Sequence, residues 1–299
     1  MIQKKPNLKL AVCLMILASI MYAVAGLFVK FIGNNVSTIM IVFVRFGFGL
    51  IILLPWLLKD TQLFKISNPR RIFYRNICSI ISLSCMFYAL KYISLADGLL
   101  LNNTSALFVP IAAFVMLKAK TSIKIWLSII LGFIGVIFIL NPDKKFLELA
   151  SLVGLISGII GGFTLVQIRQ LSKVNSTQQI LFYYFLTGTL VSGVIIPFVW
   201  QTPLTSTWWQ LLWVGVSSTL YQISIVLAYS YGPVRILSSL MFMSVICGAI
   251  FDLLLFGIVP DINSIIGMIL IIIGCFGSIY FGLNLVERKK NEEYRISSN

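Results

Sequence analysis

Apolar runs alternate with short polar turns along almost the whole chain. Ten runs can be delimited, and each is about long enough to cross a hydrocarbon layer of roughly 30 Å as an α-helix. Because the turns are short, consecutive helices should be antiparallel neighbours. The pattern predicts an all-α integral membrane protein with ten transmembrane helices, at Leu8–Phe31, Val36–Leu58, Ile72–Ile93, Leu95–Leu117, Ile123–Leu140, Leu149–Ile168, Gln179–Trp200, Trp208–Tyr231, Val234–Val259 and Ile262–Leu283.

One part of this pattern occurs twice. The stretch Tyr88–Leu140 holds two apolar segments joined by a short turn, and Leu237–Phe281 has the same layout. When the two stretches are matched without gaps, their glycines coincide: Gly132 with Gly274, and Gly135 with Gly277. We interpret these glycines, together with Gly158, Gly161 and Gly162, as sites of close helix packing.

The repetition divides the chain into two halves of five helices. We expect repeats at residues 1–142 and 143–286, followed by a polar cytoplasmic tail at 287–299. Since five is odd, the second half starts on the opposite side of the membrane, and similar halves must be inverted. Inverted repeats with a ligand site near the midplane are typical of transporters that work by alternating access.

Composition and charge agree with a membrane protein. Of the 299 residues, 59% are hydrophobic and 11% charged, whereas a soluble domain is about half apolar and a quarter charged. The net charge of +14 does not indicate nucleic-acid binding, because the basic residues lie in the turns. Alternating turns place 18 basic residues on one side and 4 on the other, with Arg45 set aside as the only intramembrane base. The rich side should be cytoplasmic, which places both termini inside. It receives Lys4, Lys5, Lys9, Lys59, Lys65, Arg70, Arg71, Arg75, Lys118, Lys120, Lys124, Arg169, Lys173, Arg235, Arg288, Lys289, Lys290 and Arg295.

The chain offers little for metal or cofactor chemistry. It has no histidine, and its five cysteines all lie in apolar runs without forming a Cys-x-x-Cys pair. We predict no metal, no cofactor and no catalytic residue. The first apolar run has basic residues before it and a small-residue triplet at Ala23–Ala25, as in a signal peptide. It continues to Phe31, however, so we interpret it as a retained helix.

Several stretches resemble the drug/metabolite transporter superfamily, and specifically its EamA family. They are SLADGLLLNNTSALFVPIAAFVML, GFIGVIFILNP, VRFGFGLIILLP and LLLFGIVPD. The resemblance covers nearly the whole chain and implies ten helices, two inverted repeats and a central cavity for a small metabolite. The family often has a glutamate in a motif FGE-x-P after the ninth helix, where this chain has Ile258. The first helix also lacks the acid that small multidrug relatives use, so proton exchange by that route is not implied.

Two charged residues lie inside predicted helices. Asp252 is the one acid well inside a span, and an intramembrane carboxylate is a candidate for coupling to protons or cations. Alternatively it is a partner of Arg45 or lies near the outer interface. Arg45 could bind an anionic group of a substrate with its planar guanidinium. The resemblance places an arginine here in many members, which implies a structural role instead.

Four consecutive polar residues, Asn102–Ser105, interrupt the fourth span. They cover a full helical turn, so they cannot all face one cavity. Asn102 and Ser105 are three apart and share a face, and they are the pair that we expect to line a cavity, the alternative being helix–helix hydrogen bonds. Other polar groups near the midplane could bind a metabolite or pack between helices. They are Tyr22, Ser82, Tyr88, Ser157, Thr164, Tyr221, Gln222 and Ser244.

The sequence therefore predicts a secondary transporter that moves a small organic metabolite across the bacterial inner membrane. The metabolite would be amino-acid-like, nucleoside-like, nucleotide-like or drug-like, and the protein's other partner is the lipid bilayer. The sequence makes no prediction of substrate identity or oligomeric state. One alternative is a lipid-carrier flippase of the same fold, which needs a laterally open groove. Another is a membrane-embedded enzyme, which lacks support because no histidine, paired carboxylates or Ser/Lys pair lies in a span.

Overall fold

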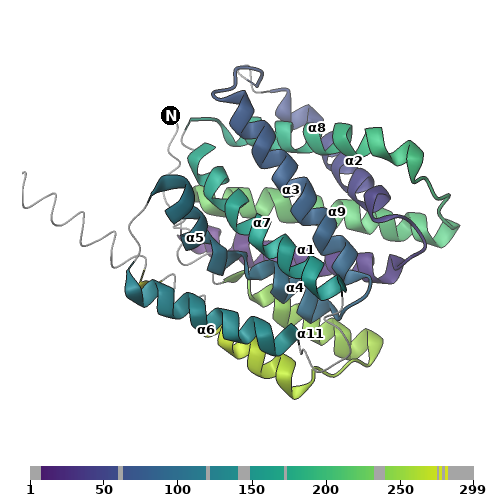
Figure 1. Cartoon of the computed structure of the whole chain (residues 1–299). Coiled ribbons are helices and arrows are strands. Elements are labelled where there is room, and N and C mark those ends of the chain that lie inside the picture. The colour runs from purple at the N-terminus through teal and green to yellow at the C-terminus, as the bar shows by residue number, and fades with distance from the viewer. Residues whose placement is uncertain are drawn as a thin grey trace, which may run out of the picture.

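The structure is a computed structural model that describes residues 8–59, 63–118, 122–140, 149–171, 174–231, 240–274, 276–277 and 280–281. Within these ranges every regular element is a helix (Figure 1). Seven helical spans are long and apolar enough to cross a membrane, and three shorter apolar helices accompany them. The predicted fold class, an all-α membrane protein with ten spans, is confirmed.

The helix boundaries follow the predicted segments closely. The helices are α1 Leu8–Ile32, α2 Thr38–Leu57, α3 Pro69–Leu90, α4 Leu95–Asn103, α5 Ser105–Leu117, α6 Ile123–Leu140, α7 Leu149–Leu171, α8 Thr177–Ile195, the short 3-10 helix η1 Ile196–Phe198, α9 Thr205–Tyr231, α11 Met243–Phe256 and a last helix Ile262–Gly274. The predicted start of the ninth span at Val234 lies outside the described residues, as do the end of the tenth span and the tail.

Local chemistry explains where several helices begin. Ser37, Ser94 and Ser176 precede α2, α4 and α8, and each side chain accepts a hydrogen bond from a backbone N–H of the first turn. At α8 the side chain of Gln179 returns the bond, which completes a capping box. In α3, Asn68 adopts a left-handed conformation immediately before Pro69, the first helical residue.

The fourth span is divided into α4 and α5 at Thr104. Its hydroxyl donates to the carbonyl oxygen of Leu101 at 2.5 Å, a local bond that competes with the regular helical ladder. The side chains of Asn102 and Asn103 project from the turn just before this break. The polar run therefore lies at an irregular point in the middle of a span.

Helix packing shows the two inverted halves directly. Exchanging the halves relates α1 to α7, α2 to α8, α3 to α9, the α4–α5 span to α11, and α6 to Ile262–Gly274. The main packed pairs obey this exchange: α1–α9 corresponds to α3–α7, α1–α11 to α7 against α4 and α5, and α2–α9 to α3–α8. The pairs α2–α8 and α4–α11 correspond to themselves.

The last helix of each half meets the other at matched glycines, with α6 alongside Ile262–Gly274 (Figure 1). A Cβ on Gly274 would lie 2.7 Å from the backbone nitrogen of Gly132, and one on Gly135 would lie 2.7 Å from the carbonyl oxygen of Gly267. Any side chain would push the two helices apart. The prediction that these glycines serve close packing is confirmed.

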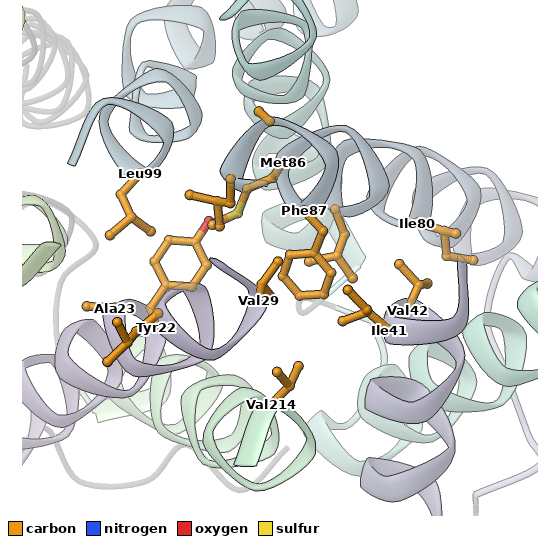
Figure 2. Close-up of a cluster of buried hydrophobic side chains, with 14 of the residues drawn as sticks. Tyr22, Ala23, Val29, Ile41, Val42, Ile80, Met86, Phe87, Leu99 and Val214 are labelled. Atoms are coloured by element: carbon orange, nitrogen blue, oxygen red, sulfur yellow. The ribbon is translucent and has the colours of Figure 1, made fainter. Parts of the chain in front are cut away.

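The buried core lies between α1, α2, α3, α4 and α9. Tyr22, Met86 and Phe87 belong to it, and the hydroxyl of Tyr22 points towards Met86 (Figure 2). The outward faces of the helices are also apolar: Phe198 is 86% exposed and Leu254 72% exposed. Such a surface is unfavourable in water and suits a lipid environment. Trp208 and Trp209 are exposed near the start of α9, and tryptophan is common at the boundary between a membrane and water.

Candidate substrate site at the centre of the bundle

Two tyrosines from different halves stack at the centre of the bundle. Tyr22 of α1 and Tyr221 of α9 have ring centroids 4.6 Å apart and an interplanar angle of 25°. The Tyr22 hydroxyl donates to Asn102 Oδ1 at 2.5 Å and also lies 2.6 Å from Met86 Sδ. The structure therefore brings together three of the predicted site residues, on α1, α4 and α9.

A line of hydrogen bonds continues from Asn102 into the first helix of the second half. Asn102 Nδ2 donates to Ser157 Oγ on α7 at 3.0 Å, and Ser82 of α3 donates to the carbonyl oxygen of Ser157 at 2.8 Å. Ser105 also faces α7, since a Cβ on Gly161 would lie 3.2 Å from Ser105 Cβ. The predicted shared face of Asn102 and Ser105 is thus turned towards α7, with the tyrosine pair beside Asn102.

Asn103 points to a different neighbour. Its Nδ2 donates to Ser244 Oγ at 3.0 Å, and Ser244 donates in turn to the carbonyl oxygen of Met241. These bonds tie α4 to α11, so Ser244 acts there as a packing contact. Of the other candidates, Tyr88 packs against Tyr92 near the end of α3, with centroids 5.0 Å apart, and Gln222 is buried beside Tyr221 in α9.

A pair of buried arginines lies next to the tyrosines. Arg45 of α2 and Arg75 of α3 are each 3% exposed. Their guanidinium carbons lie 6.0 Å and 4.7 Å from the centre of the same ring, that of Tyr184 on α8. Arg75 also donates from Nη1 to Asn76 Oδ1 at 3.0 Å, and Asn76 is bonded to α8. Nη1 of Arg45 and Nε of Arg75 are buried without a hydrogen-bond partner.

The prediction that Arg45 is the only intramembrane base is wrong. Arg75 had been assigned to a cytoplasmic turn, but α3 begins at Pro69 and places Arg75 inside an apolar span. The two arginines interact electrostatically with each other and with Tyr221. Two unit charges about 10 Å apart repel by roughly 1.7 kcal/mol at an effective dielectric constant of about 20. No acid of the described residues pairs with either arginine, so the described part of the bundle has unpaired positive charge here.

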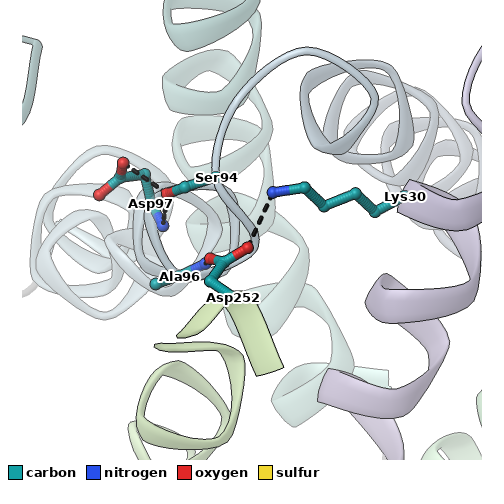
Figure 3. A network of polar contacts seen from close by, with 5 residues as sticks. All are labelled: Lys30, Ser94, Ala96, Asp97 and Asp252. Carbon is teal, nitrogen blue, oxygen red and sulfur yellow. Dashed lines mark hydrogen bonds and ion pairs between the residues drawn. The ribbon is translucent and has the colours of Figure 1, made fainter. Parts of the chain in front are cut away.

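Asp252 lies in a separate cluster near the end of α1 and the start of α4, on the side predicted to be outer. It is 1% exposed, and Oδ1 forms an ion pair with Lys30 Nζ at 2.8 Å. Oδ2 accepts a hydrogen bond from the backbone N–H of Ala96 at 2.8 Å, in the first turn of α4, next to the bond from Ser94 to Asp97 (Figure 3). The alternative that pairs Asp252 with Arg45 is wrong. A coupling role for Asp252 stays a prediction.

The described residues contain no group of three His, Cys, Asp or Glu side chains that could hold a metal ion. Cys13, Cys78, Cys85 and Cys247 are free thiols, and Cys275 lies outside the described residues. Aromatic rings, amides, hydroxyls and guanidinium groups make up the central site. Groups of these kinds are suited to binding and orienting a ligand.

The profile of the EamA-like transporter family matches the chain twice, at residues 9–141 and 148–280. The chain belongs to this family. As an EamA-like protein it is a multi-pass membrane protein and a transporter of small molecules, not an enzyme. The resemblance seen in the sequence is confirmed.

Named relatives of this EamA-like protein carry different molecules. It is 28% identical to the pseudopaline exporter CntI of Pseudomonas aeruginosa, over 90% of this chain and 95% of that protein. It is 25% identical to a riboflavin transporter of Vibrio cholerae, over 85% of each protein. It is 22% identical to an S-adenosylmethionine uptake transporter of Rickettsia prowazekii, over 90% of this chain and 92% of that protein.

A solved crystal structure shows the same fold. It superposes with a TM-score of 0.66 at 16% sequence identity, covering 91% of this chain and 98% of that one. At this identity the likeness concerns the fold alone. The described helices thus have an experimental counterpart over nearly the whole chain.

Proposed function

We propose that this protein is a secondary transporter that moves a small organic metabolite across the bacterial inner membrane by alternating access. Both termini would be cytoplasmic, and the repeats would divide as residues 1–142 and 143–286, with a cytoplasmic tail at 287–299. The observation that carries the proposal is the stack of Tyr22 on Tyr221 beside Asn102. It joins α1 and α4 of one half to α9 of the other.

A ligand held there would touch both halves at once. Two halves related by an approximate two-fold exchange can interconvert two equivalent arrangements, each open to one side. The cluster of Lys30, Asp252 and Ala96 links α1, α11 and α4 at the outer end, which supports a closed outer side in this arrangement. Opening would have to separate these three helices.

The named relatives support a metabolite as substrate but not one particular metabolite. Pseudopaline, riboflavin and S-adenosylmethionine are the molecules in their names. On the proposed site, the tyrosine faces would stack on a planar part of the ligand, and Asn102 would exchange its bond with Tyr22 for one with the ligand. Side chains around a common fold, rather than the fold itself, would select the cargo.

A lipid-carrier flippase is the second candidate, and one feature favours it. A hollow of about 370 Å³ lies where the start of α3 meets the ends of α5 and α7, on the side predicted to be cytoplasmic. It is lined by Arg71, Tyr74, Met116, Gln167, Gln170 and Leu171. Gln167 Oε1 is buried there without a hydrogen-bond partner. A basic residue beside aromatic and apolar ones suits a lipid headgroup.

Counterflow in proteoliposomes tests the proposal. Vesicles preloaded with members of a metabolite panel should accumulate the labelled form of one of them, saturably and without added ATP. Asn102→Leu should weaken the apparent affinity about tenfold, because it removes the amide that would bond to the ligand in place of Tyr22. Asn103→Leu is the matched control, since it removes a tie to α11 and should lower protein stability while the affinity is kept.

Two results would contradict the proposal. One is transfer of a fluorescent lipid between leaflets without accumulation of any metabolite, which would favour the flippase. The other is an Asn102→Leu protein that loses abundance but transports with the wild-type affinity, which would make Asn102 a packing residue.

A further inference from the structure

Among the described residues, no acid neutralises the central arginines. The described residues include three acids, and all three have other partners: Asp97 bonds to Ser94, Asp252 to Lys30 and Ala96, and Asp261 to the N–H of Ser264. Lys30–Asp252 is the one ion pair with both members in the described ranges. Arg45 and Arg75, each 3% exposed, therefore have no counter-charge from the described residues.

The aromatic surroundings offset only part of this charge. The Arg45 guanidinium lies 5.3 Å from the centre of the Phe46 ring and 5.8 Å from that of Phe87, which are favourable cation–π distances. Arg75 and Arg45, however, share the Tyr184 ring. The N–H groups of a guanidinium point outward in its plane, where a ring that lies over its face cannot accept them. Nη1 of Arg45 and Nε of Arg75 therefore have no hydrogen-bond partner.

An oxyanion supplies what both groups lack. A carboxylate or phosphate brings negative charge and acceptor oxygens in the geometry that the guanidinium fork fits. One oxyanion between two arginines would also replace their repulsion by attraction. No residue of the described chain places a carboxylate between the two arginines. Buried unpaired cations in a membrane span are costly, and they are found where substrates pass.

We propose that Arg45 and Arg75 bind an oxyanion group of the transported molecule. The proposal rests on the proposed function and names its substrate class, a small organic anion with a planar part next to its carboxylate or phosphate. The planar part would lie on the tyrosine stack, since the Tyr22 hydroxyl contacts Met86 and Arg45 lies over the ring of the next residue, Phe87. The planar part of the ligand would thus meet the aromatic side chains, and its oxyanion the two arginines.

Thermal unfolding of the purified full-length protein in detergent tests this with three matched probes. Benzoate and phenyl phosphate carry the two oxyanions on the same ring, and benzamide is the neutral counterpart of benzoate. At equal ionic strength, benzoate or phenyl phosphate should raise the melting temperature and benzamide should not. Whichever of the two acts more strongly distinguishes a carboxylate from a phosphate.

Arg45→Gln and Arg75→Gln should weaken binding of the oxyanion about ten- to hundredfold, because each removes a charged hydrogen-bond donor. Arg45→Lys and Arg75→Lys keep the charge without the planar fork, so they should show an intermediate loss and serve where a glutamine variant fails to fold. Arg70→Gln makes the same change of charge at an exposed position of α3 and should bind like the wild type.

The proposal is overturned by an equal response to benzamide, by no response to either oxyanion, or by a response that persists in both glutamine variants. Counterflow separates this failure from failure of the proposed function. If Arg45→Gln does not affect transport and the transported metabolites are neutral, the proposed transport function holds and the oxyanion site is ruled out. If oxyanion binding depends on the arginines but no metabolite is transported, the oxyanion site holds and the proposed transport function is ruled out.

Discussion

Two regions of this protein bury charged side chains, and they differ in whether those side chains have partners. At the outer end, Asp252 is buried with both oxygens engaged, one by Lys30 and the other by an N–H of α4. At the centre, Arg45 and Arg75 are as deeply buried, yet each leaves a donor unpartnered. In the Asp252 cluster both carboxylate oxygens already have partners, so the cluster has no free group for a ligand and instead links helices. The arginine pair, which has unpartnered donors, lowers the stability of the protein without a ligand and would be stabilised by a ligand that accepts those hydrogen bonds.

The largest effect should come from breaking the Asp252 cluster. Asp252→Ala leaves Lys30 as a partly buried charge without its partner and removes the acceptor for the N–H of Ala96. We expect a loss of about 3–5 kcal/mol in the free energy of unfolding, measured by denaturant titration in detergent. Asp261→Ala, which removes an acceptor for the N–H of Ser264, should cost about 1 kcal/mol.

The double substitution Lys30→Met with Asp252→Leu sharpens this result. It removes both charges together, so it should recover much of the stability that Asp252→Ala loses. If the double variant is as unstable as the single one, the ion pair is not what stabilises the outer end. The predicted coupling role adds a separate expectation for Asp252→Asn, loss of the pH dependence of transport. Unchanged pH dependence would leave Asp252 with a structural role alone.

A smaller effect, on affinity rather than stability, should follow from changing the aromatic side chains of the central site. Tyr221→Leu removes the ring that stacks on Tyr22, an interaction worth about 0.5–1.5 kcal/mol. The apparent affinity in counterflow should fall about two- to tenfold. Tyr221→Phe keeps the stacked face and should transport like the wild type. Equal losses in both variants would mean that the hydroxyl, not the ring face, contacts the substrate.

The smallest effect should be that of Arg45→Gln on stability without a ligand. No carboxylate of the described residues is left unpaired by this change, and repulsion from Arg75 is relieved. Lost cation–π contacts oppose that gain, so the free energy of unfolding should change by no more than about 1 kcal/mol. A loss as large as that of Asp252→Ala would contradict the comparison and make Arg45 a structural residue.

Hydropathy alone predicted the ten spans, and the glycine match predicted close helix packing, which the structure places between the last helices of the two halves. The two-half arrangement followed because five spans per repeat force inversion. Polar residues inside apolar runs also pointed to Tyr22, Asn102 and Tyr221, which the structure brings together. These successes share one cause, the cost of a polar group in hydrocarbon, which can be read from the residue and its neighbours in sequence.

Other features depended on packing that the sequence does not display. Lys30 and Asp252 are 222 residues apart, so their pairing follows from how α1 meets α11. Arg75 follows Arg70 and Arg71 at the start of an apolar run, which is typical of a cytoplasmic turn. Only its position on the face of α3 that meets α8 buries it. Asn102 and Asn103 differ by about 100° around one helix, and their different partners could not be assigned without the neighbouring helices.

Alternating access to the centre is the claim on which the account depends. It can be measured with Asn102→Cys in a chain whose five native cysteines are replaced by alanine, using a membrane-impermeant thiol reagent added to one side of oriented vesicles at a time. The account predicts modification from both sides and protection by a transported substrate. Modification from one side only, whether or not substrate is present, would contradict it.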